Sequence, residues 1–294
     1  MPELPEVETI VRDLNRRAPK ILGAFFVDAW TDAPKIIKKP KNFSDFKKQI
    51  RAKKIKKIWR RAKNIIFDLS GGLSLLVHQK MTGHLLYSKW QMANGRWQPL
   101  KKGVLQDSVN LYIHLMFWLD NGFMLGLSDL RKFAKVELWN TAELINLKEF
   151  KELGPEPLDK SFTFKKFEEA ITKKKGKIKQ VLMDQKIIAG IGNIYSDEIL
   201  WRAKIHPAKN VSGLDGKELK SIYRNVKKVL KTAVGLRGES FSDYRDTEGR
   251  KGNFDKARMV YQRKGEKCRR CGAVIKKLKI GGRSAHFCPH CQLL

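Results

Sequence analysis

The chain has 294 residues, and 61 Lys and Arg against 30 Asp and Glu give it a formal net charge of +31 at pH 7. This length allows two medium domains, or one large domain with a small module, and 42% hydrophobic residues suffice for buried cores, which excludes a disordered chain. The charge exceeds what solubility requires and predicts a polyanionic partner such as nucleic acid. We expect no membrane span, which needs ~20 apolar residues, since the run 111–119 is short and contains His114.

The N-terminus predicts an amphipathic helix. Pro5 suits a first helical turn. Apolar residues then recur at helical spacing, namely Val7, Ile10, Val11 and Leu14. Several glutamates at this end, without a long apolar core, argue against a secretory signal. We therefore expect a cytoplasmic protein in a reducing environment.

Removal of Met1 would turn Pro2 into a free secondary amine beside the Glu3 carboxylate. Such an amine can condense with an aldehyde carbon to give a Schiff base, whereas the Met1-Pro2 amide cannot. The positive end of the predicted helix disfavours the ammonium form of the amine. The same residues also fit a Glu-capped amphipathic helix with no further role.

The middle of the chain predicts β-structure followed by a boundary. From Phe25 to about Trp139, short apolar runs alternate with turns, as in an antiparallel β-sandwich or barrel. Between Lys47 and Lys63 almost every position that is not apolar is basic, which fits either a nucleic-acid surface or an ordinary solvated face. The Leu-Gly-Pro-Glu-Pro sequence at 153–157 then predicts a domain boundary near residue 150.

A helical region follows this boundary. Helices are expected over 164–172, 178–183, 193–204 and 217–234. Gly190-Ile191-Gly192-Asn193 predicts a tight turn whose exposed amides hold a phosphate, and upstream lysines such as Lys179 favour this over a plain helix connection. Residues 237–254 predict a polar loop that either closes over a substrate or is simply disordered.

Four cysteines near the C-terminus have the spacing of a zinc ribbon. They form two C-x2-C pairs with sixteen residues between them: Cys268, Cys271, Cys288 and Cys291. Disulfides are the alternative, but a reducing compartment disfavours them, so we predict one zinc ion. Four thiolates leave no open position for water, which favours a structural role. His286 and His290 lie nearby, but the cysteine pairs already supply four ligands.

Together these residues resemble the bacterial formamidopyrimidine-DNA glycosylases, from Pro2 to the last cysteine pair. The motifs that carry the resemblance are Pro-Glu-Leu-Pro-Glu at 2–6, Arg61-Ala62-Lys63, Met81-Thr82-Gly83, Asp129-Leu130-Arg131-Lys132-Phe133, Gly192-Asn193-Ile194-Tyr195 and the four-cysteine finger.

The resemblance implies an α+β multidomain protein. Its parts are an N-terminal β-sandwich with an N-terminal helix, a helix-two-turn-helix domain and a C-terminal zinc finger. We place these parts at residues 1–140, 158–262 and 263–294, with a linker at 141–157.

The resemblance also implies base-excision repair of double-stranded DNA that contains oxidised bases or abasic sites, by a monomer that removes oxidised purines. Pro2 nitrogen attacks the anomeric carbon and expels the base, while Glu3 supplies the proton that opens the sugar. The iminium acidifies the neighbouring C–H bond, so the strand is cut by β-elimination and then δ-elimination. Lys63 and Arg283 correspond to residues that bind the flanking phosphates and are assigned to the eliminations.

The target base must leave the helix before Pro2 can reach its sugar. Met81, Arg131 and Phe133 match the family's wedge, which fills the vacated stack and contacts the abandoned partner base. Without the resemblance, Met81 and Phe133 would be interpreted as core residues. Lys179 and Asn193 match DNA-contacting positions of the helical domain.

Three positions depart from the family pattern. Tyr112 stands at a DNA-contacting position that is usually His, with His114 two residues later on the same strand face. Ala134 replaces a usual glycine, which restricts the turn. Glu239 enters a loop that is usually built of small residues and is expected to cap the flipped base, so the lesion preference stays open.

Two other functions stay open. An endonuclease VIII-like glycosylase would prefer oxidised pyrimidines, but Leu4 and the Arg131-x-Phe133 wedge favour the purine-directed branch. A non-catalytic, zinc-stabilised DNA-binding protein would need none of Pro2, Glu3 or Lys63.

Overall fold

The computed structural model of the chain describes residues 1–240 and 243–294. The chain forms two compact units: unit 1 comprises 1–151 and 236–255, and unit 2 comprises 152–235 and 256–294. These bounds differ from the predicted domains, because the segment 236–255 lies with the N-terminal unit and not with the helical one. Two residues of the predicted loop over 237–254, Phe241 and Ser242, lie outside the described part.

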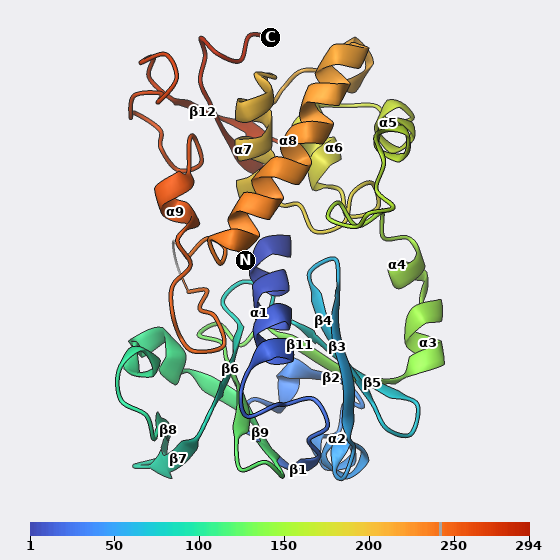
Figure 1. Ribbon diagram of the computed structural model, residues 1–294, viewed down its shortest axis with the longest axis vertical. Coiled ribbons are helices and arrows are strands. Elements are labelled where there is room, and N and C mark those ends of the chain that lie inside the picture. Colours follow the sequence, from blue (N-terminus) through green and yellow to red (C-terminus); the bar gives the residue numbers. More distant parts are fainter. Residues whose placement is uncertain (241–242) are drawn as a thin grey trace. The chain divides into compact units, whose positions relative to one another are not determined.

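Unit 1 is a β-sandwich with helix α1 (Leu4–Arg16) packed against it (Figure 1). One sheet has four strands in the order β1 (Phe26–Thr31), β9 (Ile113–Leu119), β10 (Met124–Ser128) and β6 (His84–Ser88). The other has five strands in the order β2 (Ile37–Lys39), β11 (Lys135–Asn140), β5 (Leu73–His78), β4 (Asn64–Leu69) and β3 (Ile55–Arg61).

Alternation of side chains along the strands builds the core of unit 1. The inward residues of both sheets join one apolar cluster that includes Phe26, Phe67, Leu75, Phe117 and Val136. One face of α1 completes this cluster with Val7, Ile10 and Leu14. The predicted β-sandwich with an N-terminal helix is therefore confirmed, and its strands pair antiparallel except for β2, which pairs parallel with β11.

Shorter elements surround the two sheets. They are helices α2 (Phe43–Ile50), α3 (Thr141–Asn146) and α4 (Lys148–Lys151), the 3-10 helices Pro34–Ile36, Val104–Gln106 and Ser108–Leu111, and the hairpin of β7 (Trp90–Ala93) and β8 (Arg96–Pro99). A second apolar cluster joins this hairpin to the four-stranded sheet, with Trp90 and Trp97 packed among Leu86, Met116 and Met124.

Unit 2 contains the predicted helices and a small hairpin. Its elements are α5 (Phe164–Thr172), α6 (Ile178–Met183), α7 (Asn193–Ala203), the 3-10 helix Val211–Gly213, α8 (Gly216–Gly235), β12 (Lys276–Ile280) and β13 (Arg283–Phe287). The short helix α9 (Phe254–Ala257) begins in unit 1 and ends in unit 2. Each of the four predicted helices ends within one residue of the expected position. Among the described residues, no helix combines the length and apolar character needed to cross a bilayer.

A buried histidine ties the segment 236–255 to the sandwich. His84 Nε2 lies 2.9 Å from Asn110 Oδ1, and Asn110 Nδ2 donates to the Gly249 carbonyl at 3.2 Å. Burial lowers the pKa of His84 from 6.5 to about 4, so the ring is neutral at pH 7.

We predict that this histidine makes unit 1 acid-sensitive. Below pH 6.5, His84 of the unfolded chain binds a proton, whereas His84 of the folded chain stays neutral. The free energy of unfolding therefore falls as the pH drops from 6.5 to about 4. At about pH 4 the free energy of unfolding is lower by about 3 kcal/mol than above pH 6.5. Urea unfolding followed by hydrogen exchange of the β6 and β10 amides reports on unit 1 alone.

His84→Gln should make this pH dependence shallower without abolishing it, because burial also lowers the pKa of His78 in the same unit, to about 3. His290→Gln, which removes an exposed histidine, should leave it unchanged. An equally steep acid loss in His84→Gln would contradict the assignment.

Candidate active site and metal centre

The N-terminal residues are held in place by a capping interaction. Glu3 is the N-cap of α1 and is 2% exposed, and its backbone N–H donates to Glu6 Oε2 at 2.7 Å. The other oxygen of Glu6 accepts the backbone N–H of Glu239, also at 2.7 Å. One buried carboxylate thus joins the chain beside Pro2 to the start of the loop expected to cap the flipped base.

Gly238 makes this arrangement possible. Its φ is +80°, and a Cβ at this position would lie 2.5 Å from Glu6 Oε1. Any side chain here would therefore displace the Glu6 carboxylate. Glu239 itself is buried, with 4% of its surface exposed, so the polar residue that departs from the family pattern does not project into solvent.

Lys63 lies in a positively charged corner of unit 1. It follows Ala62 in the tight turn between β3 and β4, where Ala62 has a φ of +52°, and it is buried. His78 at the end of β5 pairs with Asn64 of β4 and Lys135 of β11. Burial, aided by Lys80, Lys63 and Lys135, lowers the pKa of His78 to about 3.

His78 is a candidate residue that the sequence analysis missed. Its Nδ1 accepts the backbone N–H of Lys80 at 3.0 Å, which leaves Nε2 as the protonated nitrogen of the neutral ring. A neutral N–H donor among three lysines forms a site for an anion such as a phosphate. The sheet register brings these side chains together, although Lys63, His78 and Lys135 are far apart in the sequence.

The residues of the predicted wedge lie exposed on a braced turn. Met81 is 42% exposed and Phe133 is 51% exposed, which rules out the alternative that they are core residues. The Arg131 guanidinium lies 4.6 Å from the centroid of the Phe133 ring.

Asp129 fixes the shape of this turn. Its buried carboxylate accepts hydrogen bonds from the Thr82 hydroxyl and from the Ala134 backbone N–H. Thr82 Oγ1 also accepts the Arg131 backbone N–H at 3.1 Å. The positive φ of this turn falls on Lys132, at +55°, and not on Ala134, so the alanine that replaces a glycine does not strain it.

Tyr112 is exposed and precedes β9, whereas His114 is buried. His114 Nδ1 pairs with Asp32 Oδ1 at 2.8 Å. The side chain available to a ligand at this edge is therefore that of Tyr112.

Lys179, which matches a DNA-contacting position of the family, makes its contacts inside unit 2. Lys179 on α6 is fully buried, and its ammonium lies 2.5 Å from Asp197 Oδ1 and 3.1 Å from Ser196 Oγ. It also donates to the Asn193 carbonyl at 3.3 Å. Lys179 thus positions the start of α7. Its ammonium is paired with Asp197 and does not reach the surface.

The candidate residues of the helical part and the finger share a network in unit 2. Asp197 Oδ2 accepts the backbone N–H of His286 at 2.8 Å and lies 3.0 Å from His286 Nδ1. Asn193 Nδ2 donates to Ser284 Oγ at 3.3 Å, next to the exposed Arg283 that begins β13. Asn193 and Arg283 therefore lie on adjoining elements of one unit.

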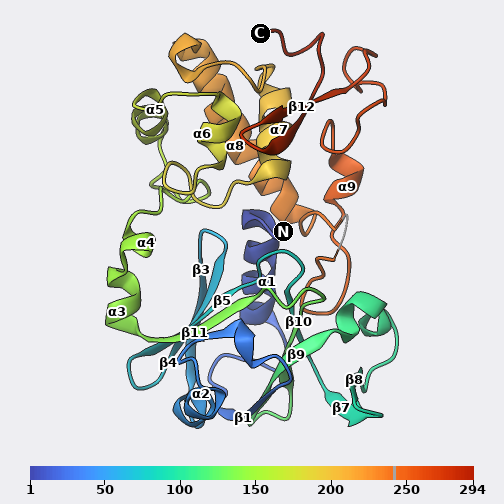
Figure 2. The ribbon, with the colours of Figure 1, turned by 180° about the vertical axis from the view of Figure 1, so that it is seen from behind.

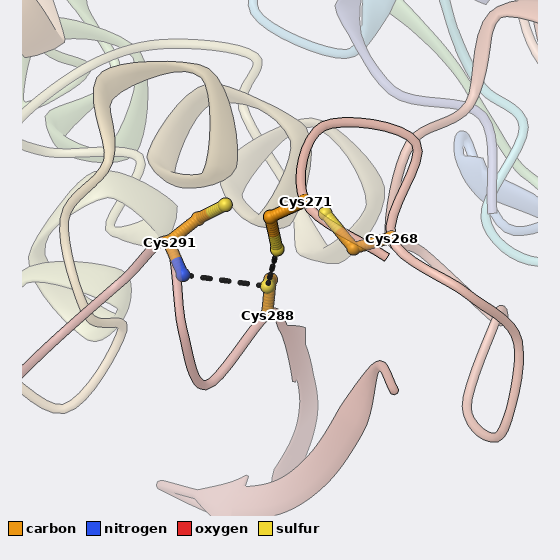
Figure 3. Close-up of side chains that lie close together, drawn as sticks. All are labelled: Cys268, Cys271, Cys288 and Cys291. Atoms are coloured by element: carbon orange, nitrogen blue, oxygen red, sulfur yellow. Dashed lines mark hydrogen bonds between the residues drawn. The ribbon is translucent and has the colours of Figure 1, made fainter. Parts of the chain in front are cut away.

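The four cysteines converge at the base of the β12–β13 hairpin (Figure 3). Their sulfur atoms all lie within 4.8 Å of one another, and Cys271 Sγ lies 3.4 Å from Cys288 Sγ. Tetrahedral zinc with Zn–S bonds of ~2.3 Å places its sulfur ligands ~3.8 Å apart, so the four thiols fit this metal. Although burial opposes it, the backbone N–H groups of Arg270 and Cys271 lower the pKa of Cys268 to about 6, which favours a thiolate ligand.

This centre is a structural zinc site. Four cysteine sulfurs complete a tetrahedron and leave no open position for a reacting group. Cys268 and Cys288 are buried against Trp201 of α7, so the bound ion fixes the finger to the helical part of unit 2.

We predict a zinc-to-protein ratio of one in reduced, freshly purified protein, measured by metal analysis. The Cys288→Ser protein should lose the zinc ion and should no longer bind DNA. The sandwich of unit 1 should stay folded, because the cysteines all belong to unit 2. The exposed His290 provides the control, since His290→Ala should keep both. Zinc loss in His290→Ala, or full zinc in Cys288→Ser, would contradict the four-cysteine assignment.

Known proteins match the chain along nearly its whole length. Residues 1–136 match the formamidopyrimidine-DNA glycosylase N-terminal domain, 153–245 match its H2TH domain, and 265–293 match a zinc finger found in FPG and IleRS. The formamidopyrimidine-DNA glycosylase of Pelotomaculum thermopropionicum is 40% identical over 99% of both chains. That of Bacillus cereus is 34% identical, again over 99% of both.

Solved structures agree with these matches. The Lactococcus lactis Fpg in complex with an abasic site containing DNA is 34% identical, with a TM-score of 0.84 over 99% of this chain and 100% of that one. MutM in complex with carbocyclic 8-oxo-G containing DNA has the same identity and TM-score over 100% of both chains. With the same three parts in the same order, the chain belongs to the formamidopyrimidine-DNA glycosylase family.

Proposed function

We propose that the protein is a DNA glycosylase and abasic-site lyase of base-excision repair that removes oxidised purines. The observation that carries this proposal is the N-terminal end, where Glu6 fixes both the backbone beside Pro2 and the loop residue Glu239. A DNA-binding protein without catalysis would not need an N-terminal secondary amine beside a carboxylate at this place. The relatives solved with abasic-site and 8-oxo-G DNA support the same substrate class here.

The proposed chemistry begins after Met1 is removed. The free Pro2 nitrogen attacks C1′ of the damaged nucleotide, the bond from C1′ to the base breaks, and the base leaves with the bonding electrons. Glu3 donates the proton that opens the sugar, which gives an iminium between Pro2 and C1′. The iminium makes the C2′ proton acidic, so the 3′ phosphate and then the 5′ phosphate leave by elimination.

Basic side chains hold the phosphates during these steps. We assign this role to Lys63, with His78 as an additional neutral donor, and to Arg283, whose guanidinium stays charged at neutral pH and serves as a charge clamp rather than a proton donor. Asn193 and the exposed Tyr112 are further backbone contacts, and Lys179 acts by positioning Asn193. The zinc ion takes no part in the reaction and holds the finger that carries Arg283.

The wedge fills the space that the flipped nucleotide leaves. Met81 and Phe133 supply apolar surface to the stack, and Arg131 hydrogen-bonds the partner base. A guanidinium can donate to both the carbonyl oxygen and the ring nitrogen of an unpaired cytosine, a pair of acceptors that adenine lacks.

We predict that borohydride traps a covalent complex between the mature protein and damaged DNA through Pro2. Pro2→Gly, or a chain that keeps Met1, should lose trapping because no secondary amine remains. Intact mass shows which terminus is present. Both forms should still bind a reduced abasic-site analogue, which shows that the fold is kept. Trapping at the same level by these forms would assign the nucleophile to another amine.

We predict that Arg131→Ala relaxes the choice of partner base. The loss of one good bidentate contact corresponds to about 1–3 kcal/mol, which is roughly ten- to a hundredfold in discrimination between cytosine and adenine. Single-turnover excision of 8-oxoguanine opposite each of the four bases measures this ratio.

Lys132→Ala is the matched control, because it removes the same charge from the next residue of the turn and should keep the ratio. The Lactococcus lactis Fpg was also solved with an oxidised pyrimidine containing DNA, so a pyrimidine lesion belongs in the same series. Faster removal of the pyrimidine than of 8-oxoguanine opposite cytosine would place the chain with the pyrimidine-directed function instead.

A further inference from the structure

Unit 1 contains a cavity that the proposed repair chemistry does not use. It has a volume of about 440 Å³, within the range of roughly 300–1,000 Å³ that is typical of small-molecule sites. Three segments line it: residues 30–32 around the end of β1, residues 95–98 of the β7–β8 hairpin, and residues 108–114 leading into β9. Figure 2 shows this hairpin near β9 and the 3-10 helix Ser108–Leu111 that leads into it.

Aromatic side chains form part of the cavity wall. Trp30 and Trp97 meet edge to face with ring centroids 5.4 Å apart, and Tyr112 lies at the same cavity. Trp97 is 6% exposed, and its indole nitrogen has no hydrogen-bond partner among the described residues. The indole nitrogen itself has almost no accessible surface, so the aromatic wall offers a ligand apolar ring surface and not this donor.

The polar groups of the cavity carry opposite charges. Asp32 is held by His114 through Oδ1, and its side chain is 44% exposed, so the carboxylate stays accessible from the cavity. Arg96 lies exposed on the hairpin at the same cavity. The carboxylate disfavours a simple anion and the guanidinium disfavours a simple cation. A ligand that suits both has N–H donors at one end and a negative charge at the other.

We propose that this cavity binds one unpaired guanine nucleotide. The base lies against the aromatic wall, its adjacent N1–H and N2–H groups donate to Asp32, and its phosphate meets Arg96. The assignment to a nucleotide rests on the proposed function, because Tyr112 is both a wall of the cavity and an expected DNA contact. The guanine can belong to a DNA strand or to a free nucleotide, since both offer the same chemistry.

Isothermal titration with dGMP and with dIMP tests the site directly. The two ligands differ only in the N2 amine, so loss of one hydrogen bond to a charged group should make dIMP bind about tenfold more weakly. Asp32→Asn should abolish this difference, and Arg96→Ala should weaken both ligands equally. Lys101→Ala, which removes a charge from the exposed loop after the hairpin and outside the cavity, should change neither.

A duplex with a single unpaired guanine overhang separates the two sources of the nucleotide. Tighter binding of this duplex than of a blunt one, lost in Asp32→Asn, places the guanine in DNA, whereas a preference seen only with dGMP places it with free nucleotides. Absence of dGMP binding, equal binding of dGMP and dIMP, or a preference that survives in Asp32→Asn would overturn the site. Excision of 8-oxoguanine from a blunt duplex, measured on the same samples, tests the proposed repair function separately.

Discussion

Unit 2 depends on two adjacent buried carboxylates of α7, Asp197 and Glu198. Asp197 binds Lys179 of α6 with one oxygen and His286 of the finger with the other. Glu198 accepts the backbone N–H groups of residues 259–261, where the chain enters the finger. Removing one partner of such a buried pair typically costs about 3–5 kcal/mol, because the other charge stays buried. The position of the finger that carries Arg283 thus depends on the carboxylates of α7.

Unit 1 uses a buried carboxylate in a similar way at the N-terminus. Glu6 satisfies two backbone N–H groups that come from opposite ends of the unit's sequence, and the Tyr244 hydroxyl donates to its carbonyl oxygen. A lysine or arginine could not take this role, because neither side chain has a hydrogen-bond acceptor. An acid that is held by amide N–H groups fixes geometry without adding a further cation to a surface that is already strongly basic.

The parts that could be predicted from the sequence are those that local patterns determine. Helix ends, the cysteine pairs and the alternating strands depend on neighbours within one element, and the family resemblance added the wedge. Burial across elements could not be predicted in this way. Lys179 appeared to be a surface cation within a lysine-rich run, but helix packing places Asp197 opposite it. Glu6, His78 and the cavity at Trp97 were missed because their partners come from distant strands or, for Glu239, from 233 residues away.

The segment 236–255 also has a consequence for how the protein is made on the ribosome. Because these residues supply Tyr244, Asp246 and Gly249 to unit 1, the sandwich is complete only after the helices of unit 2 have been synthesised. Domains generally fold as units during synthesis, starting from the N-terminus, but here the first unit must wait for its last segment. During that interval Glu239 does not yet cover the N-terminal end. Until then the Glu6 carboxylate lacks the Glu239 backbone N–H, so the turn beside Pro2 is held by one hydrogen bond fewer than in the finished fold.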